Sequence, residues 1–269
     1  MLKDRMLPQE CFRGKTVLIT GGGTGLGLVT AQRFGELGAN LVIASRKREH
    51  LDPAEAMLCK GGAPVLSVVT DVRRPSDVAE MTRRSIERFG AVDVLINNAA
   101  GNFLCGAKDL SPGGWKVVID IALNGVFYCT REVGLHMIER GHGSIVNIVA
   151  AYAWTGGPGT AHSAAAKAGV VALTRTLAVE WARYGIRVNA VCPGIFNSDG
   201  ARQRLWPSKE QEEALRDSVP LHRFGEMEEI ANAITYLASP FADYVNGEVL
   251  VIDGALHLGR GLPQVPRVD

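Results

Sequence analysis

The sequence predicts an α/β fold in which a doubly wound parallel sheet of about seven strands lies between two layers of helices. Short runs of β-branched and aliphatic residues alternate along the chain with longer segments of helical pattern. Most of these runs are apolar without alternation, which is typical of strands buried on both faces. The chain has 269 residues, 46% of them hydrophobic, and no linker or internal repeat. We therefore expect a single three-layer domain.

The strand-like runs are short and rich in Val, Ile and Leu, and turn residues or helical segments separate them. Parallel strands of this kind need long crossover connections between them, which the helical segments can supply. The predicted strands are Thr16–Thr20, Asn40–Ala44, Val65–Val69, Asp93–Ile96, Ser144–Val149, Arg187–Val191 and Glu248–Ile252.

Helical segments fill the intervals between these strands, so the crossovers are expected to be right-handed. In an open sheet of this type, ligands bind outside the carboxyl ends of the strands. The predicted helices are Gly25–Leu37, His50–Cys59, Ser76–Phe89, Pro112–Glu139, His162–Tyr184, Lys209–Asp217 and Met227–Leu237.

Composition excludes several classes of function. The net charge is +1, so no generally basic surface for nucleic acid or membrane is expected. No uncharged apolar stretch approaches the ~20 residues that span a bilayer, and the N-terminus lacks a signal-peptide core. The five cysteines form no C-x-x-C pair, and the six histidines form no H-x-x-x-H pair. We expect reduced thiols, no metal site and a cytoplasmic protein.

A glycine-rich turn follows the first predicted strand and precedes a helix. Its G-x-x-x-G-x-G spacing lets the backbone turn tightly and approach a pyrophosphate at the positive end of that helix. A glycine-rich turn alone is weak evidence, and the plain alternative is a tight turn without a ligand. Its context between strand and helix favours a dinucleotide site. The candidate residues are Gly21, Gly23, Thr24, Gly25, Leu26 and Gly27.

The end of the second strand bears on which dinucleotide binds. Ser45 stands where folds that select NAD usually carry an acidic residue for the ribose 2′-hydroxyl. Two cations follow it, Arg46 and Lys47. A guanidinium can grip a 2′-phosphate in a fork, so NADP(H) is the predicted cofactor. The alternative is a solvated basic loop.

Two later strand ends carry further candidates. Asp71 and Val72 follow the third strand, where the carboxylate would accept from the adenine amine, although Asp71 could also cap a helix. The segment Asn97-Asn98-Ala99-Ala100-Gly101 follows the fourth strand and is small and polar. Asn98 and Ala99 are therefore expected beside the cofactor.

Together these residues resemble the short-chain dehydrogenase/reductase family from roughly Phe12 to Gly254, with further matches at Asn124, Lys167 and Asp253-Gly254. The resemblance implies a Rossmann-type subunit whose N-terminal half binds the dinucleotide. It also implies assembly as a homo-tetramer. Cofactor contacts are implied after the sixth strand, at Pro193, Gly194, Ile195 and Phe196.

The expected chemistry departs from that of most family members, which use a serine and a Tyr-x-x-x-Lys pair. Lys167 is present, but Ser163 stands where the tyrosine would be, and Ala150-Ala151 near the usual serine. An aliphatic hydroxyl is a poor proton donor beside a tuned phenol, which places ordinary ketone reduction in doubt. Another tyrosine, Tyr152, follows the fifth strand at the catalytic edge, where a tyrosine is otherwise often a packing residue.

This rearrangement resembles one branch of the family, the 2,4-dienoyl-CoA reductases, which have a strand-end tyrosine, a serine in place of the usual tyrosine, and the lysine. The segments Ala44–Lys47, Asn97–Phe103 and His162–Gly169 carry the match. The resemblance implies that NADPH delivers hydride to the delta carbon of a 2,4-dienoyl thioester. Tyr152 and Asn102 would donate hydrogen bonds to the thioester oxygen as charge develops there.

The same resemblance implies roles for the remaining residues. Reprotonation of the alpha carbon would give a 3-enoyl product. Lys167 would hold the ribose, Ser163 would bridge by a hydrogen bond, and Asn124 would have a structural role, holding a water. Arg73 and Arg204 match positions that contact coenzyme A, and Phe103 and Ser111 match positions that line the substrate. A lid is expected near residues 195–219, altered because a second proline after Pro193-Gly194 is missing.

Two other functions remain open on the sequence. One is a 2-enoyl-CoA reductase or a carbonyl- or 3-oxoacyl-reducing enzyme, with Ser163 or Tyr152 as the acid. The other is a non-catalytic NADP-binding scaffold, which the presence of Lys167, Asn124 and Tyr152 disfavours. The leading hypothesis is an NADPH-dependent dienoyl-CoA reductase of unsaturated fatty acid β-oxidation, acting on an acyl-CoA thioester.

Overall fold

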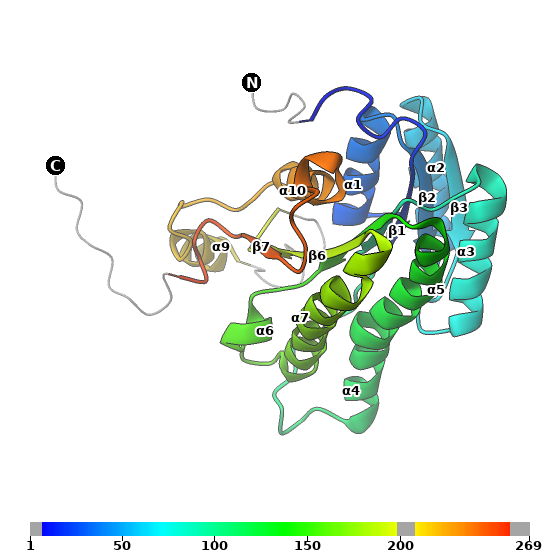
Figure 1. Ribbon diagram of the computed structural model, residues 1–269. Coiled ribbons are helices and arrows are strands. Elements are labelled where there is room, and N and C mark those ends of the chain that lie inside the picture. Colours follow the sequence, from blue (N-terminus) through cyan, green and yellow to red (C-terminus); the bar gives the residue numbers. More distant parts are fainter. Residues whose placement is uncertain (1–6, 198–207, 259–269) are drawn as a thin grey trace.

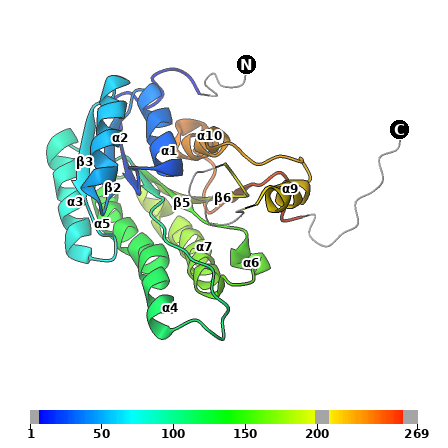
Figure 2. The same cartoon turned by 180° about the vertical axis from the view of Figure 1, so that it is seen from behind.

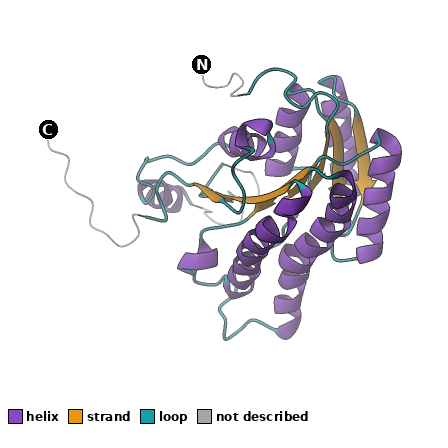
Figure 3. Ribbon diagram, viewed as in Figure 1, coloured by secondary structure: helices purple, strands orange, loops and turns teal. Residues whose placement is uncertain are grey.

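The computed structural model describes residues 7–197 and 208–258 and contains one parallel sheet of seven strands in the order β3-β2-β1-β4-β5-β6-β7 (Figures 1 and 3). All seven predicted strands are confirmed, with bounds that shift by at most two residues. The strands are β1 (Thr16–Thr20), β2 (Asn40–Ser45), β3 (Val65–Val69), β4 (Val94–Asn97), β5 (Gly143–Ile148), β6 (Ile186–Pro193) and β7 (Val249–Ile252).

The strand order places the topological switch point between β1 and β4. The chain runs outward from β1 to β2 and β3, and then crosses back to pair β4 with the other side of β1. Thr20, at the end of β1, is in register with Ala44 on one side and with Asn97 on the other. Because all strands are parallel, their carboxyl ends meet at one edge, where such sheets bind ligands.

Helices cover both faces of the sheet. The first hydrophobic core packs α1, α2 and α10 on one face, and the second packs α3, α5 and α7 on the other. The helices are α1 (Gly25–Glu36), α2 (Arg48–Lys60), α3 (Pro75–Phe89), α4 (Pro112–Ile119), α5 (Gly125–Arg140), α6 (Tyr152–Thr155), α7 (Ala161–Trp181), α9 (Lys209–Asp217) and α10 (Met227–Ala238).

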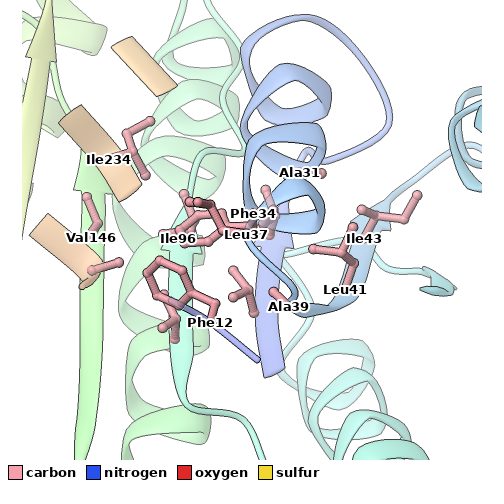
Figure 4. Close-up of a cluster of buried hydrophobic side chains, with 14 of the residues drawn as sticks. Phe12, Ala31, Phe34, Leu37, Ala39, Leu41, Ile43, Ile96, Val146 and Ile234 are labelled. Carbon is pink, nitrogen blue, oxygen red and sulfur yellow. The ribbon is translucent and has the colours of Figure 1, made fainter. Parts of the chain in front are cut away.

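The core below α1 joins the N-terminal segment to the centre of the sheet. Phe12 and Phe34 meet edge to face with ring centroids 4.9 Å apart, in the same buried cluster as Leu37 and Ile96 (Figure 4). Each is fully buried or nearly so, and burying an aromatic side chain contributes about 1.5–3 kcal/mol. This packing holds the segment before β1 against the last turn of α1.

A polar network crosses the second core. The Asn97 amide donates to Asn147 Oδ1 at 2.8 Å, and the Asn147 amide donates to Thr174 Oγ1 on α7 at 2.9 Å. All three side chains are buried, so the hydrogen bonds offset the cost of removing their polar atoms from water. The network ties β4 and β5 to α7.

The long helix predicted over Pro112–Glu139 is interrupted. One turn of π-helix, Asp120–Asn124, separates α4 from α5. Within that turn Asn124 Nδ2 donates to Asp120 Oδ1 at 2.9 Å. Single π turns inside α-helices are frequent at functional sites.

Two other details differ from the sequence-based expectation. The short helix α6 was not predicted, because four residues carry no periodic signal. The predicted helix over His162–Tyr184 ends as an α-helix at Trp181 and continues as one 3₁₀ turn. Among the described residues, no helix is long and apolar enough to cross a membrane.

Candidate active site

The glycine-rich turn between β1 and α1 is shaped by close backbone approach. A Cβ on Gly27 would overlap the carbonyl oxygen of Gly21, and one on Gly23 would lie 2.9 Å from the carbonyl oxygen of His50. Gly21 and Gly25 have φ of +67° and +52°, which side chains other than hydrogen rarely allow. The sequence therefore needs glycine at these positions for the turn to close.

The first turn of α1 is open to a ligand. Thr24 is its N-cap residue and its side chain makes no capping hydrogen bond, so the helix begins with unpaired N–H groups. A cavity of about 450 Å³ begins there and runs along the carboxyl ends of the strands past Gly21, Ser45, Asp71 and Asn102. Such N–H groups attract a phosphate. The turn and this cavity fit a dinucleotide.

Hydrogen bonds of Asn98 and Thr20 join the segment after β4 to the end of β1, at the topological switch point. The Asn98 amide donates to the carbonyl oxygens of Thr20 and Gly21, at 3.0 and 3.2 Å. Thr20 Oγ1 accepts from the backbone N–H groups of Asn98 and Ala99, at 3.1 and 3.0 Å. These bonds hold the segment after β4 against the glycine-rich turn. Thr20 was not among the predicted site residues, although its position just before the turn could have indicated it.

At the end of β2 the two predicted cations differ. Lys47 Nζ donates to Glu49 at 2.7 Å, so part of its charge is neutralised locally. Arg46 is exposed, and within residues 7–197 and 208–258 it has no hydrogen bond or ion pair. Ser45 is half-buried and lines the cavity beside Arg46. Arg46 is therefore the cation available to a phosphate at this point.

Asp71 and Arg73 form a pair just after β3. The Arg73 guanidinium donates to both carboxylate oxygens of Asp71, with Nε at 2.9 and 3.0 Å. This hydrogen bonding lowers the pKa of Asp71, and the nearby charge of Arg46 lowers it further. Asp71 and Val72 both line the cavity. The Arg73 guanidinium is directed at Asp71.

Tyr152 and Ser163 meet across two helices. Tyr152 opens α6, four residues after the end of β5, Ser163 lies in the first turn of α7, and the two helices lie side by side (Figures 1 and 2). Their hydroxyl oxygens are 2.9 Å apart, and either can be the donor. Burial raises the pKa of Tyr152, and the Ser163 hydrogen bond lowers it in part. Tyr152 therefore stays protonated and can donate.

Lys167 lies one turn after Ser163 on α7, on the same face of the helix. Its side chain is 6% exposed, and Nζ donates to the carbonyl oxygen of Ile148 at 2.5 Å. Burial lowers the pKa of Lys167 to about 8. The end of β5 therefore positions two side chains of the site. It holds Lys167 through the Ile148 carbonyl oxygen, and Tyr152 lies four residues after Ile148 in the chain.

Asn102 and Phe103 lie on the exposed segment that follows β4. Phe103 N–H donates to Asn102 Oδ1 at 2.9 Å, which directs the oxygen of this amide toward the backbone. In the described part of the chain, Asn102 Nδ2 has no hydrogen-bond partner. Asn102 thus offers a donor at the same edge of the sheet as Tyr152.

Several predicted residues lie at the margin of this site or beyond it. Ser111 Oγ accepts from Gly114 N–H at 3.1 Å and so caps α4. Pro193 ends β6, and Gly194 lies so close to Asp253 that a Cβ there would be only 2.5 Å from the Asp253 side chain. Ile195 and Phe196 continue from that point, both half-buried. Arg204 and part of the expected lid lie outside the described residues.

A larger cavity, about 630 Å³, opens at the opposite end of the sheet. It is lined by the starts of β1, β4, β5 and β6, where Asp93 pairs with Lys15 and Arg140 at 3.7 and 3.4 Å. Among the described residues that line it, none belongs to the glycine-rich turn or to the carboxyl end of a strand. The described residues hold no cluster of three or more His, Cys, Asp or Glu side chains placed to bind a metal ion.

Comparisons with known proteins agree with this geometry. Residues 21–257 match the family model described as enoyl-(acyl carrier protein) reductase. A probable 2,4-dienoyl-CoA reductase of Bacillus subtilis, named as producing (2E)-enoyl-CoA, is 44% identical over 89% of this chain and 95% of its own length. A peroxisomal 2,4-dienoyl-CoA reductase of Arabidopsis thaliana, named as producing (3E)-enoyl-CoA, is 37% identical over 96% of this chain and 89% of its own.

Among solved structures, a short chain dehydrogenase from Bacillus anthracis is 47% identical, with a TM-score of 0.84. The alignment covers 94% of this chain and 99% of that one. The similarity therefore extends over most of the chain. The chain belongs to the short-chain dehydrogenase/reductase family of oxidoreductases.

Proposed function

We propose that this protein reduces 2,4-dienoyl-CoA thioesters with NADPH and forms 3-enoyl-CoA. The observation that carries the proposal is the hydrogen bond between Tyr152 and Ser163, one helical turn before Lys167. This arrangement places a tyrosine phenol on α6, just after the end of β5, instead of on α7. The relatives named above as 2,4-dienoyl-CoA reductases support the same assignment.

The cofactor would lie along the 450 Å³ cavity. Its pyrophosphate would meet the N–H groups at the start of α1, and its 2′-phosphate would meet Arg46. Asp71, Val72, Asn98 and Ala99 would border the adenine and ribose, and Lys167 would hold the nicotinamide ribose. When bound, NADPH supplies a hydride to the delta carbon of the substrate.

The chain's own contribution is to stabilise the charge that then develops on the thioester oxygen. Asn102 presents its amide donor after β4, and the Tyr152 phenol on α6 can donate to the substrate when Ser163 donates its proton to the phenol oxygen. Donors that are already oriented cost no reorganisation at the moment of reaction, and one of them contributes about 10²–10³ in rate. Ser163 holds the phenol in place, and Lys167 keeps the local potential positive.

The rest of the substrate site would be formed by residues around these donors. Phe103, Ser111 and a lid near residues 195–219 would enclose the acyl chain. Arg73 and Arg204 would contact the phosphates of coenzyme A. Arg73 would then turn from Asp71 toward the ligand, exchanging one charge-assisted pair for another. Assembly as a homo-tetramer, a single domain and a cytoplasmic location complete the proposal.

The experiment is to incubate the purified protein with NADPH and 2,4-hexadienoyl-CoA and to follow the loss of NADPH absorbance. Parallel reactions contain 2-hexenoyl-CoA, 3-oxohexanoyl-CoA, or NADH in place of NADPH. Turnover of the dienoyl substrate with preference for NADPH is expected. If only the 3-oxoacyl or 2-enoyl thioester is reduced, one of the alternative activities replaces this one.

A second candidate concerns the position of the product double bond. Protonation of the dienolate at the alpha carbon gives the 3-enoyl thioester, whereas protonation at the gamma carbon gives the 2-enoyl thioester. The B. subtilis relative is named for the second product and the A. thaliana relative for the first. Reaction in D₂O followed by NMR locates the deuterium, and the 3-enoyl assignment requires it on the alpha carbon.

A further inference from the structure

His162 is a fully buried residue beside Ser163 that the proposed function leaves without a role. It lies in the first turn of α7 and is 0% exposed. A buried imidazole in a native protein normally has both ring nitrogens hydrogen-bonded. Here Nδ1 accepts from Ser163 N–H at 2.8 Å, whereas Nε2 has no hydrogen-bond partner within the described residues.

The hydrogen bond at Nδ1 fixes the state of the ring. Because Nδ1 accepts from a backbone N–H, the proton of the neutral imidazole is on Nε2. The same bond satisfies one of the free N–H groups at the start of α7, where Thr160 makes no side-chain cap. His162 therefore caps the helix that carries Ser163 and Lys167.

The imidazole also holds the segment that follows β4. The rings of His162 and Phe103 meet edge to face, with centroids 4.6 Å apart and planes at 84°. Edge-to-face contacts place the positive edge of one ring against the negative face of another. Phe103 is itself bonded to Asn102, since its N–H donates to Asn102 Oδ1. A backbone bond from Cys105 N–H to Gly159 O, at 3.0 Å, ties the same two segments together next to this contact.

These contacts form one continuous path between the two donors of the proposed site. It leads from Asn102 through Phe103 to His162, and from Ser163 to Tyr152. Asn102 and Tyr152 come from segments that follow different strands, so a contact between those segments must set their separation. His162 is the buried side chain that touches both arms of the path.

We propose that His162 is a positioning residue that sets the separation of the Asn102 and Tyr152 donors. The inference rests on the proposed function, in which both donors bind the same thioester oxygen. An error of about 1 Å in placing such groups can cost about 10²-fold in rate. His162 contributes no proton and need not touch the substrate; it acts through Phe103 and Ser163.

Three substitutions separate its two contacts. His162→Phe keeps an aromatic ring against Phe103 and removes the acceptor for Ser163 N–H, whereas His162→Asn keeps an acceptor and removes the ring. His162→Ala removes both. We expect kcat for the dienoyl thioester to fall about tenfold to hundredfold in His162→Ala and less in the other two variants. The dissociation constant for NADPH stays within about twofold in all three.

A double-mutant cycle distinguishes positioning from loss of stability. If His162 acts through Asn102, His162→Ala costs much less rate when Asn102→Ala is already present, because the donor it positioned is gone. Thr174→Val is the matched control, since it removes buried hydrogen bonds from the same helix away from the site. It lowers stability but leaves kcat unchanged. Additive losses in the cycle would overturn the proposal.

Hydrogen exchange tests the inference without any substrate. The backbone amides of Phe103 and Cys105 exchange faster in His162→Ala than in wild type, and Thr174→Val does not change them. Equal exchange in wild type and His162→Ala would overturn the positioning role. A different result would be a wild-type protein that does not reduce the dienoyl thioester, together with faster exchange in His162→Ala. That result would contradict the proposed function but would still show that His162 links the two segments.

Discussion

The glycine-rich turn and the Tyr152–Ser163–Lys167 cluster occupy the same edge of one sheet, yet they are built in different ways. The turn depends on backbone atoms, because a Cβ at Gly27 would overlap the Gly21 carbonyl oxygen. The cluster depends on side chains from two helices, held by the 2.9 Å bond between Tyr152 and Ser163. The turn is consequently sensitive to added volume, and the cluster to single polar atoms and to charge.

The largest effect is expected in the turn. Gly27→Ala should abolish measurable NADPH binding and cost about 1–3 kcal/mol of stability, because the new methyl group overlaps Gly21 and the Asn98 amide. Fluorescence titration with NADPH and urea unfolding measure the two effects. Gly35→Ala, on the same helix, meets only Ala63 Cβ and Leu41 at 3.1 and 3.3 Å and should keep its affinity. Equal affinity in both variants would contradict a backbone-determined site.

In the cluster, removal of the Tyr152 hydroxyl oxygen is expected to lower kcat without changing the affinity for the cofactor. Tyr152→Phe should lower kcat about 10²–10³-fold, because a donor to the thioester oxygen is lost. The dissociation constant for NADPH should not change. Steady-state kinetics and titration test both statements, with Tyr128→Phe on α5 as the control tyrosine. Unchanged turnover in Tyr152→Phe would show that the phenol is not part of the reaction.

Within the cluster, burial of Lys167 should add a pH-dependent contribution to stability. Burial lowers the pKa of Lys167 to about 8, below its ordinary value of 10.5. Between these values Lys167 holds more protons in the unfolded chain than in the folded one, so its contribution to stability rises with pH by up to about 1.4 kcal/mol per unit. Below about pH 8 the cost of burying the charge is fully present. Urea unfolding of the cofactor-free protein from pH 7 to 10 measures the slope.

Lys167→Met supplies the comparison for this slope, because it replaces the ammonium by a neutral side chain of similar length. The free energy of unfolding of wild type relative to Lys167→Met should increase as pH rises from about 8 toward 10. Gly27→Ala carries the same lysine and should show the wild-type slope. A constant difference between wild type and Lys167→Met across this range would refute the lowered pKa.

The smallest effect is expected at the end of β2. Arg46→Ser should weaken NADPH about tenfold and leave NADH almost unchanged, since one charge-assisted contact to a phosphate contributes on the order of 1.4 kcal/mol at an exposed site. Lys60→Ser, which removes the same charge from the exposed end of α2, is the control. The preference for NADPH is measured as the ratio of kcat/KM with NADPH to kcat/KM with NADH. An equal decrease in kcat/KM with NADPH and with NADH would mean that Arg46 supports the fold.

The same contrast explains what the sequence could predict. The strands and the glycine-rich turn are local patterns, so the sheet, its seven strands and the turn were predicted to within two residues. The meeting of Tyr152 with Ser163 depends on how α6 folds back on α7, which no local pattern encodes. It was predicted only through a family resemblance.

Other parts of the site could not be predicted for definite physical reasons. The pairing of Arg73 with Asp71 is a choice among rotamers of a long side chain, and the sequence records only that both are present. The role of Thr20 depends on backbone N–H groups of a distant segment. The burial of His162 requires knowing that Phe103 covers it, although the two are far apart in the chain.

The π turn at Asp120–Asn124 also affects the register of the helices on either side of it. A π turn holds one residue more than an α-helical turn, whereas each residue of an α-helix advances the chain by about 100°. A regular helix with the same number of residues would therefore rotate α4 by about that angle relative to α5. The hydrophobic face of one of the two helices would then turn away from its core. Because the wide turn absorbs the extra residue, deleting one residue there should leave a regular helix in which α4 and α5 keep their present faces toward the protein.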